Sequence, residues 1–473
     1  MNLIHDFLTE AGVRANQTAI IDKSGKSVTY SELSRMSAQL AGEYSAKGIV
    51  KGDRVLVGTF PGIGLYAGLA ALWRLGAVAV FPEPALGITG VRHAALVTQP
   101  KALLASWKVG VLARLFPETR RIPIRLSAET AGRGENDILE PMEPSEPALI
   151  SFTSGSTGQP KAIERSHGLM RAQHTALAPL IAPERETEVD IVAFPAFVLT
   201  CIGHGTTAVM PTWNLRRQDR MPLTAVTHLA EHTNATRLLL PPVAVAQLKH
   251  VPLPSNVRRI MTGGGPLYPD VARQFLKEHA GLGLTNVYGS TEAEPIAFEH
   301  LENLAEQDWV IAATGGGLPV GVPVKDVVLR VHENEIQVAG PHVNRGYLDP
   351  SQNETTKIYD GDRIWHRTGD AGRLDDQGQL WLLGRHGAST DGLFAFAIET
   401  AARLWPGVSA AAFAVDTNSK PVLFLAGSSQ YAVQWKSQMN ALADIELVVV
   451  DRIPMDRRHR SKPDIKKLLA DHR

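Results

Sequence analysis

The sequence predicts an α/β protein with a large N-terminal domain of two helix-covered sheets plus a small β unit, followed by a small α+β C-terminal domain. Helix-like and strand-like stretches alternate over residues 29–104 and again over residues 191–288, which predicts the two sheets. From about Val320 onward, short runs alternate apolar and polar residues, as antiparallel strands do. We therefore expect domains over residues 1–384 and 385–473.

The first alternating set begins with a well-marked helix. Residues 29–32, Thr-Tyr-Ser-Glu, form a capping-box pattern, and apolar residues then recur at helical spacing from Leu33 to Tyr44, before Gly48. The elements that follow are expected at residues 54–57 (strand), 65–75 (helix), 78–81 (strand) and 101–104 (strand). This order predicts a parallel sheet covered by helices.

The second alternating set follows an acidic, proline-rich connection at residues 135–147 and a short strand at 148–150. Strands are expected at residues 191–194, 238–240, 257–262 and 284–288, and helices at 224–232 and 271–279. The small β unit is expected from runs at residues 327–331, 335–338 and 378–383. Two α/β lobes in one large domain are therefore predicted.

Composition excludes several classes of protein. The 48 basic residues balance the 48 acidic ones, so nothing favours nucleic acid or an acidic membrane as a partner. Cys201 is the single cysteine and lies in an apolar run, so we expect a small buried side chain and no disulfide within the chain. Neither a signal peptide nor a membrane span is expected, and a cytoplasmic location is the default.

The stretch at residues 151–161 carries the chemistry of a phosphate loop. Glycines allow a close backbone approach to an anion, hydroxyl groups donate hydrogen bonds to phosphate oxygens, and Lys161 adds a positive charge. A P-loop is excluded, because Gln159 and Pro160 separate Gly158 from Lys161. The alternative is a solvated glycine- and serine-rich turn between two elements.

Three further motifs follow predicted strands or precede a β unit. At residues 286–292 the strand end carries Tyr288 and Glu292, suited to base stacking and to Mg²⁺, or else forms a turn with a solvated glutamate. The glycine run at 263–265 would let backbone pass close to a ligand, or is a plain loop. Asp370 could accept hydrogen bonds from ribose hydroxyls, or sits in a simple hairpin turn.

These motifs together resemble those of the adenylate-forming ligase superfamily, which contains acyl-CoA synthetases, luciferases and the adenylation domains of peptide synthetases. The resemblance rests on Thr-Ser-Gly-Ser-Thr-Gly-x-Pro-Lys at 153–161 and Tyr-Gly-x-Thr-Glu at 288–292. It also rests on the order of Tyr-Leu at 347–348, Thr-Gly-Asp at 368–370 and Gly-Arg at 384–385. It implies a large domain followed by a small mobile one, and it implies ATP and Mg²⁺ as cofactors.

The resemblance also implies roles for individual residues. Tyr288 would stack on adenine, Thr291 would contact the α-phosphate, and Glu292 would coordinate Mg²⁺. The basic tail at 454–462, otherwise a solvated segment, would deliver Lys462 to stabilise charge on the α-phosphate and carboxylate. Catalytic roles are thus expected for Lys462, Glu292 and Thr157. Nucleotide contacts are expected from Thr153, Ser154, Gly155, Ser156, Thr157, Gly158, Lys161, Gly263, Gly264, Gly265, Tyr288, Gly289, Ser290, Thr291, Asp370 and Arg385.

The substrate is expected to be a carboxylic acid, fatty or β-hydroxylated. Phe194 and Phe197, before an apolar run to Ile202, would line an acyl tunnel with Gly264, or else form a core strand. Phe-Pro-x-Phe at 194–197 and Pro-x-Asp-x-Arg-His-x-x-Lys at 454–462 resemble the OleC-like β-lactone synthetases, and the acidic hinge and lysine usual after Gly-Arg are absent.

Three functions remain open from the sequence. The first is adenylation with pyrophosphate release, followed by intramolecular β-lactone formation. The second is transfer of the acyl group to CoA or a carrier protein. The third is nucleotide binding without catalysis, which would require a broken site, although Glu292, Asp370 and Lys462 are all present. A P-loop ATPase is disfavoured by the absence of Gly-Lys-Ser/Thr.

Overall fold

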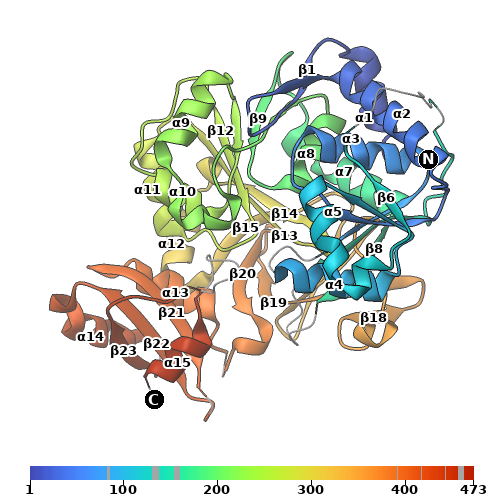
Figure 1. Cartoon of the computed structure of the whole chain (residues 1–473). Helices are drawn as coiled ribbons and strands as arrows, with labels where there is room; N and C mark the ends of the chain where they lie inside the picture. The colour runs from blue at the N-terminus through green and yellow to red at the C-terminus, as the bar shows by residue number, and fades with distance from the viewer. Residues whose placement is uncertain are drawn as a thin grey trace.

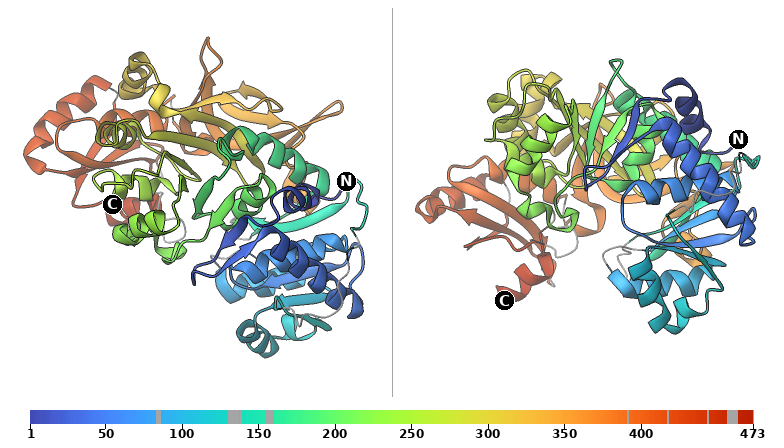
Figure 2. Two further views of the ribbon diagram at one scale, coloured as in Figure 1. Left: turned by 90° about the horizontal axis from the view of Figure 1, so that it is seen from above. Right: turned by 45° about the horizontal axis from the view of Figure 1, so that its top comes forward.

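The fold has a large sheet-rich N-terminal domain and a small C-terminal domain, as the sequence predicted (Figure 1). This computed structural model describes residues 1–82, 86–129, 137, 139–153, 160–390, 392–416, 418–442, 444–455 and 463–472, without the side chains of 216, 218, 219, 441 and 442. The two chain termini lie on opposite sides of the molecule in every view (Figure 2).

The first sheet has six strands in the order β6-β5-β3-β4-β7-β8. Its strands are β3 (Arg54–Gly58), β4 (Val78–Phe81), β5 (Ala102–Ala105), β6 (Ile124–Leu126), β7 (Pro147–Thr153) and β8 (Lys161–Ser166). All neighbours are parallel except β7 and β8, which pair antiparallel and bring Thr153 opposite Lys161. The predicted parallel sheet is therefore confirmed.

The second sheet has fourteen strands, because the small β unit continues it edge to edge. Its order is β16-β17-β19-β20-β15-β14-β13-β12-β11-β9-β10-β1-β2, with β18 on β19. The parallel part contains β9 (Val189–Val192), β10 (Thr207–Val209), β11 (Arg237–Leu239), β12 (Arg259–Gly263) and β13 (Gly283–Ser290). The antiparallel part contains β14 (Ala293–His300), β15 (Leu318–Pro323), β16 (Val328–His332), β17 (Glu335–Ala339), β18 (Lys357–Asp360), β19 (Arg363–Leu374) and β20 (Leu380–Arg385).

The first two strands of the chain belong to the second sheet. β1 (Thr18–Ile21) pairs parallel with β10, and β2 (Ser27–Thr29) pairs with β1. The chain therefore starts in the second lobe before it builds the first. This long-range pairing ties the two lobes together.

Helices fill the space between the sheets and cover their outer faces (Figure 1). The shared core combines residues of both sheets with apolar faces of α1 (His5–Val13), α2 (Tyr30–Ala46), α3 (Ile63–Arg74), α7 (His167–Ile181) and α8 (Pro195–Gly203). The first sheet is covered outside by α4 (Gly87–Thr98) with α5 (Trp107–Leu112) and α6 (Pro117–Arg120). The second is covered by α9 (Leu223–His232), α10 (Pro242–Leu248), α11 (Pro269–Glu278) and α12 (Glu306–Ile311).

The predicted capping box is confirmed, whereas the core strand considered after Phe194 is wrong. The capping box at the start of α2 is formed, with reciprocal hydrogen bonds between Thr29 and Glu32. The stretch after Phe194 was weighed as a core strand, but it is helix α8, because Pro195 suits the first turn of a helix. Cys201 on that helix is buried, and burial raises its pKa.

The C-terminal unit holds a three-stranded sheet with helices. Its strands are β21 (Val408–Val415), β22 (Pro421–Gly427) and β23 (Glu446–Val450), and its helices are α13 (Ala395–Arg403), α14 (Ala432–Leu442) and α15 (Ile465–Asp471). α13 joins this unit to the large domain through an Arg403–Asp270 ion pair of 2.8 Å and a Tyr268–Glu399 hydrogen bond. The boundary between residues 384 and 385 falls at the end of β20 and stays a prediction. None of the helices in the described ranges is long and apolar enough to cross a membrane.

Candidate active site

The site predicted from the sequence lies where parallel strands β12 and β13 end. Glycines are required there, because a Cβ on Gly263 would lie 2.6 Å from the Val287 carbonyl oxygen. A Cβ on Gly289 would likewise lie 2.8 Å from the Ala293 carbonyl oxygen. Gly264 has φ +77° and no atom within 4 Å of its Cβ position, so the turn is open on that side. At these three glycines the chain therefore presents only backbone atoms to the site.

Tyr288, Asp370 and Arg385 form one hydrogen-bonded group. The Tyr288 hydroxyl donates to Asp370 Oδ2 at 2.9 Å, and Arg385 Nη1 donates to Asp370 Oδ1 at 2.6 Å. Burial and the Asp370 carboxylate both raise the pKa of Tyr288, so the phenol stays protonated. Asp370 also raises the pKa of Arg385, although burial opposes it. Three residues predicted to bind nucleotide, from β13, β19 and β20, are thus in contact.

Glu292 and Lys161 meet at a tyrosine that sequence reasoning did not single out as a site residue. The Tyr347 hydroxyl donates to Glu292 Oε1 at 2.9 Å, and Lys161 Nζ lies 5.0 Å from the centre of the Tyr347 ring. Tyr347 is fixed by a β-bridge between its backbone and Ile163 of β8. The end of the predicted phosphate loop and the predicted metal ligand are therefore linked through one side chain.

A buried lysine close to Tyr347, Lys357, was not predicted as a site residue from the sequence. Lys357 is 4% exposed, and its Nζ donates to the Asn344 carbonyl oxygen and lies 5.8 Å from the Tyr347 ring centre. Burial lowers the pKa of Lys357 to about 8, although Glu292 opposes the change. No sequence pattern marks Lys357, because its burial depends on how the loop that carries Asn344 and Tyr347 folds over it.

Several predicted residues lie outside the described part of the chain. They are Ser154, Gly155, Ser156, Thr157 and Gly158 of the phosphate loop, and Lys462. Of the remaining predicted contacts, Ser290 Oγ is buried without a hydrogen-bond partner among the described residues. The Thr291 carbonyl oxygen accepts from Arg165 Nη2 at 2.7 Å.

A cavity of about 380 Å³, here called the acyl cavity, lies beside Thr291. Its wall is mainly apolar and comes from helices between the two sheets, with Phe7, Leu33, Leu65, Leu69, Phe197 and Ile202 among the lining residues. Phe194 packs near Phe197, with ring centres 6.0 Å apart. Of the three predicted acyl contacts, Phe197 lines the cavity, whereas Phe194 and Gly264 do not.

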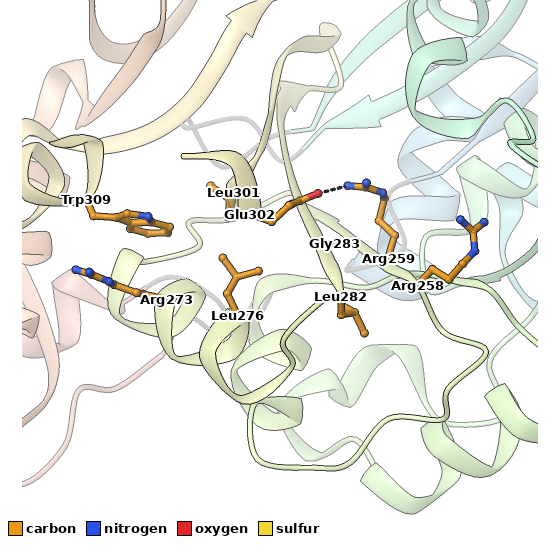
Figure 3. Close-up of a pocket in the computed structure, with 10 residues that line it drawn as sticks. Arg258, Arg259, Arg273, Leu276, Leu282, Gly283, Leu301, Glu302 and Trp309 are labelled. Atoms are coloured by element: carbon orange, nitrogen blue, oxygen red, sulfur yellow. Dashed lines mark hydrogen bonds and ion pairs between the residues drawn. The ribbon is translucent and has the colours of Figure 1, made fainter. Parts of the chain in front are cut away.

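A second cavity, of about 580 Å³, lies at the opposite edge of the same sheet, near the first residues of β12 and β13 (Figure 3). Three arginines line it, and each is paired with a carboxylate: Arg258 with Glu188, Arg259 with Glu302, and Arg273 with Glu306. These pairs compensate the charges of the arginines, and the cavity shares no residue with the predicted site.

Comparisons with known proteins identify the family and the fold. The family described as AMP-binding enzyme matches residues 7–348. An olefin beta-lactone synthetase of Stenotrophomonas maltophilia is 30% identical over 402 residues, covering 75% of this chain and 72% of that protein. Another, of Xanthomonas campestris pv. campestris, is 27% identical over 419 residues, covering 79% and 74%.

A solved structure, amide bond synthetase McbA from Marinactinospora thermotolerans, matches with a TM-score of 0.81 at 21% identity, covering 98% of both chains. At 21% identity, this likeness shows that the two chains share the same fold.

Proposed function

The chain belongs to the AMP-binding enzyme family and is an adenylate-forming ligase, and we propose that it activates a fatty or β-hydroxy acid with ATP and Mg²⁺. A carboxylate oxygen of the acid attacks the α-phosphorus of ATP, the bond to the β-phosphate breaks, and pyrophosphate leaves. The product is an acyl-AMP. Such a step needs positioning and charge stabilisation more than covalent help from the protein.

Two groups of contacts carry this proposal: Tyr288 and Arg385 meet at Asp370, and Glu292 and Lys161 meet at Tyr347. Asp370 offers carboxylate oxygens to ribose hydroxyls, and Arg385 orients that carboxylate through its hydrogen bond. Tyr288 presents its ring to adenine. Lys161 and the hydroxyls of the phosphate loop hold the phosphates.

Glu292 fits a magnesium ion shared with the nucleotide. Mg²⁺ prefers oxygen ligands and usually keeps several waters and phosphate oxygens, so one protein carboxylate is enough. Within the described residues, no three His, Cys, Asp or Glu side chains gather into a metal cage. A structural relative, o-succinylbenzoate CoA synthetase of Bacillus subtilis, has been solved with ATP and magnesium ion. That relative supports the same pair of ligands here.

Lys462 completes the proposal from the C-terminal domain. Its positive charge would stabilise the negative charge that develops as the acid attacks the α-phosphate. Because α13 joins this domain to the large one through Arg403 and Glu399, we infer that a movement of the domain brings the lysine in and releases it.

For the second half-reaction we favour β-lactone closure. The β-hydroxyl oxygen attacks the acyl carbonyl carbon, the hydroxyl proton is lost, and AMP leaves. The two olefin beta-lactone synthetases among the relatives support this outcome. The alternative is thioester formation with CoA or a carrier protein, which relatives such as the acyl–CoA ligase YdaB of Bacillus subtilis, 26% identical, keep open.

The test is mass spectrometry of products from ATP, Mg²⁺ and a panel of carboxylic acids, each with and without CoA. A lactone lighter than the β-hydroxy acid by one water, formed without CoA, is the expected result. A CoA thioester would replace lactone closure by the ligase alternative. Acid-dependent release of AMP with neither product would point to another acceptor, and absence of turnover with every acid would contradict the adenylation itself.

A further inference from the structure

The acyl cavity has a mainly apolar wall that also carries polar side chains, among them Asp6, Arg171 and His174. A separate group of polar side chains, here called the polar corner, surrounds Glu294. Arg165 of β8, Gln173 of α7 and Glu294 of β14 all line the cavity, together with Ser151 of β7. Thr291, one residue before the predicted metal ligand, lines the same cavity. The polar corner therefore lies at the end of the cavity that carries the adenylation motif.

Among the described residues, one of the two Glu294 carboxylate oxygens has a hydrogen-bond partner. Gln173 Nε2 donates to Glu294 Oε2 at 3.3 Å, and the neighbouring Arg165, which is 8% exposed, gives its Nη2 to the Thr291 carbonyl oxygen instead. This carboxyl group therefore lies in a cavity with one oxygen available to a ligand.

Two more polar atoms in this corner have no partner among the described residues. They are Arg165 Nε and Ser151 Oγ, and both are buried. A buried donor without an acceptor is costly, and such groups are normally satisfied by a ligand or water. The corner thus offers both donors and acceptors to a small polar group.

We propose that Glu294, with Arg165 and Gln173, binds a hydroxyl group carried close to the carboxyl carbon of the acid. This inference rests on the proposed adenylation and assigns specificity within the same cavity. A hydroxyl group both donates and accepts, so it can donate to Glu294 and accept from Arg165. The acid without the hydroxyl leaves these groups unpaired.

Arg165 and Glu294 line the corner together, so a charged substituent of the acid, either an ammonium group or a second carboxylate, would meet one group of like charge. A neutral hydroxyl can pair with both groups without that repulsion. Thr291, which lines the same cavity, is the residue before the predicted metal ligand Glu292, and this position favours a hydroxyl near the carboxyl end of the acid.

The test compares Glu294→Leu and Glu294→Gln with the unchanged protein on three acids: 3-hydroxydecanoic, 10-hydroxydecanoic and decanoic acid. The readout is kcat/KM for pyrophosphate release, with binding of each acid measured in parallel by calorimetry. For Glu294→Leu we expect kcat/KM for 3-hydroxydecanoic acid to fall about 10- to 100-fold, while decanoic acid changes less than about twofold. Glu294→Gln should keep most of the preference, because the amide still pairs with a hydroxyl.

Glu299→Gln is the matched control, since Glu299 lies on the same strand and does not line the cavity. An equal fall for all three acids in Glu294→Leu would reduce Glu294 to a structural residue and overturn the inference. Equal use of 3-hydroxydecanoic and decanoic acid by the unchanged protein would do the same, as would a preference for 3-aminodecanoic acid. If no acid releases pyrophosphate, the proposed function fails, and calorimetric preference for the 3-hydroxy acid still decides the role of Glu294.

Discussion

The Asp370 carboxylate accepts from two donors, Tyr288 and Arg385, and is the residue through which the nucleotide site can be tested most simply. In Asp370→Asn we expect KM for ATP to rise about 10- to 100-fold, because charge-assisted hydrogen bonds to the ribose are lost. Steady-state pyrophosphate release at varied ATP measures this. Asp376→Asn, an exposed residue in the turn after β19, is the control. An unchanged KM for ATP in Asp370→Asn would remove Asp370 from the nucleotide site.

Lys462 tests the contribution of the C-terminal domain to the chemical step. In Lys462→Ala we expect acyl-AMP formation to fall by about 10²- to 10³-fold with ATP affinity nearly unchanged, because the charge acts in the transition state. Single-turnover formation of acyl-AMP and calorimetric ATP binding separate the two effects. Lys466→Ala, on α15, should behave like the unchanged protein. Normal acyl-AMP formation in Lys462→Ala would refute the assigned role.

Site residues inside short motifs could be predicted from the sequence, but the residues that contact them from elsewhere in the chain could not. Tyr288 and Glu292 stand in one short motif that resembles the superfamily, so both could be named as candidates for one site. Tyr347 contacts Glu292 from 55 positions away, and Gln173 contacts Glu294 from 121 positions away. Such contacts depend on how β8, α7 and β14 pack, and no local pattern encodes that.

At the scale of elements, α13 holds the C-terminal domain through Arg403, whose guanidinium makes two hydrogen bonds to Asp270, of 2.9 and 2.8 Å. Arg403 also lies over the Tyr268 ring at 4.5 Å. We expect Arg403→Ala to destabilise the docked arrangement by on the order of 3 kcal/mol, since a partly buried carboxylate loses its partner. Faster amide exchange in α13 would report this change.

Arg273→Ala is the control for that experiment, because the Arg273–Glu306 pair is exposed and contributes little. Exchange in α13 should stay at its original rate in this control. Equal exchange in Arg403→Ala and the unchanged protein would show that the ion pair does not hold the domain.

Helices and strands were predicted correctly where periodicity and capping residues mark them locally. The order in which strands pair was not predicted, because it depends on contacts between distant parts of the chain. The helix after Thr29 was predicted by its capping box and apolar face, both within one short window. The place of β1 in the second sheet was not predicted, because its partner β10 lies almost two hundred residues later. The small β unit was recognised by its alternation, but its continuity with the second sheet depends on the pairing of β15 with β20.

At the scale of the whole molecule, Glu399 makes stability depend on pH. Burial raises its pKa from 4.5 to about 7, while Tyr268 and the Phe413 amide oppose the change by donating to it. The folded state therefore binds the Glu399 proton more tightly than the unfolded state does. Protonation of Glu399 thus stabilises the fold fully below pH 4.5, and this stabilisation is lost as pH rises through about 7. In Glu399→Gln this loss is absent.

Buried histidines have lowered pKa values and change stability with pH in the opposite direction. The difference in melting temperature between the unchanged protein and Glu399→Gln therefore isolates the contribution of Glu399. We expect the unchanged protein to lose stability relative to Glu399→Gln between pH 5 and pH 8. A difference that stays constant over that range would contradict the raised pKa of Glu399.

The central claim is that an acid carboxylate attacks the α-phosphorus of ATP. The most direct test supplies a carboxylic acid labelled with ¹⁸O in both carboxylate oxygens and measures the mass of the AMP formed. The account predicts that one ¹⁸O passes into the phosphate of AMP and that pyrophosphate carries none. Unlabelled AMP, or release of ADP and phosphate in its place, would contradict attack at the α-phosphorus.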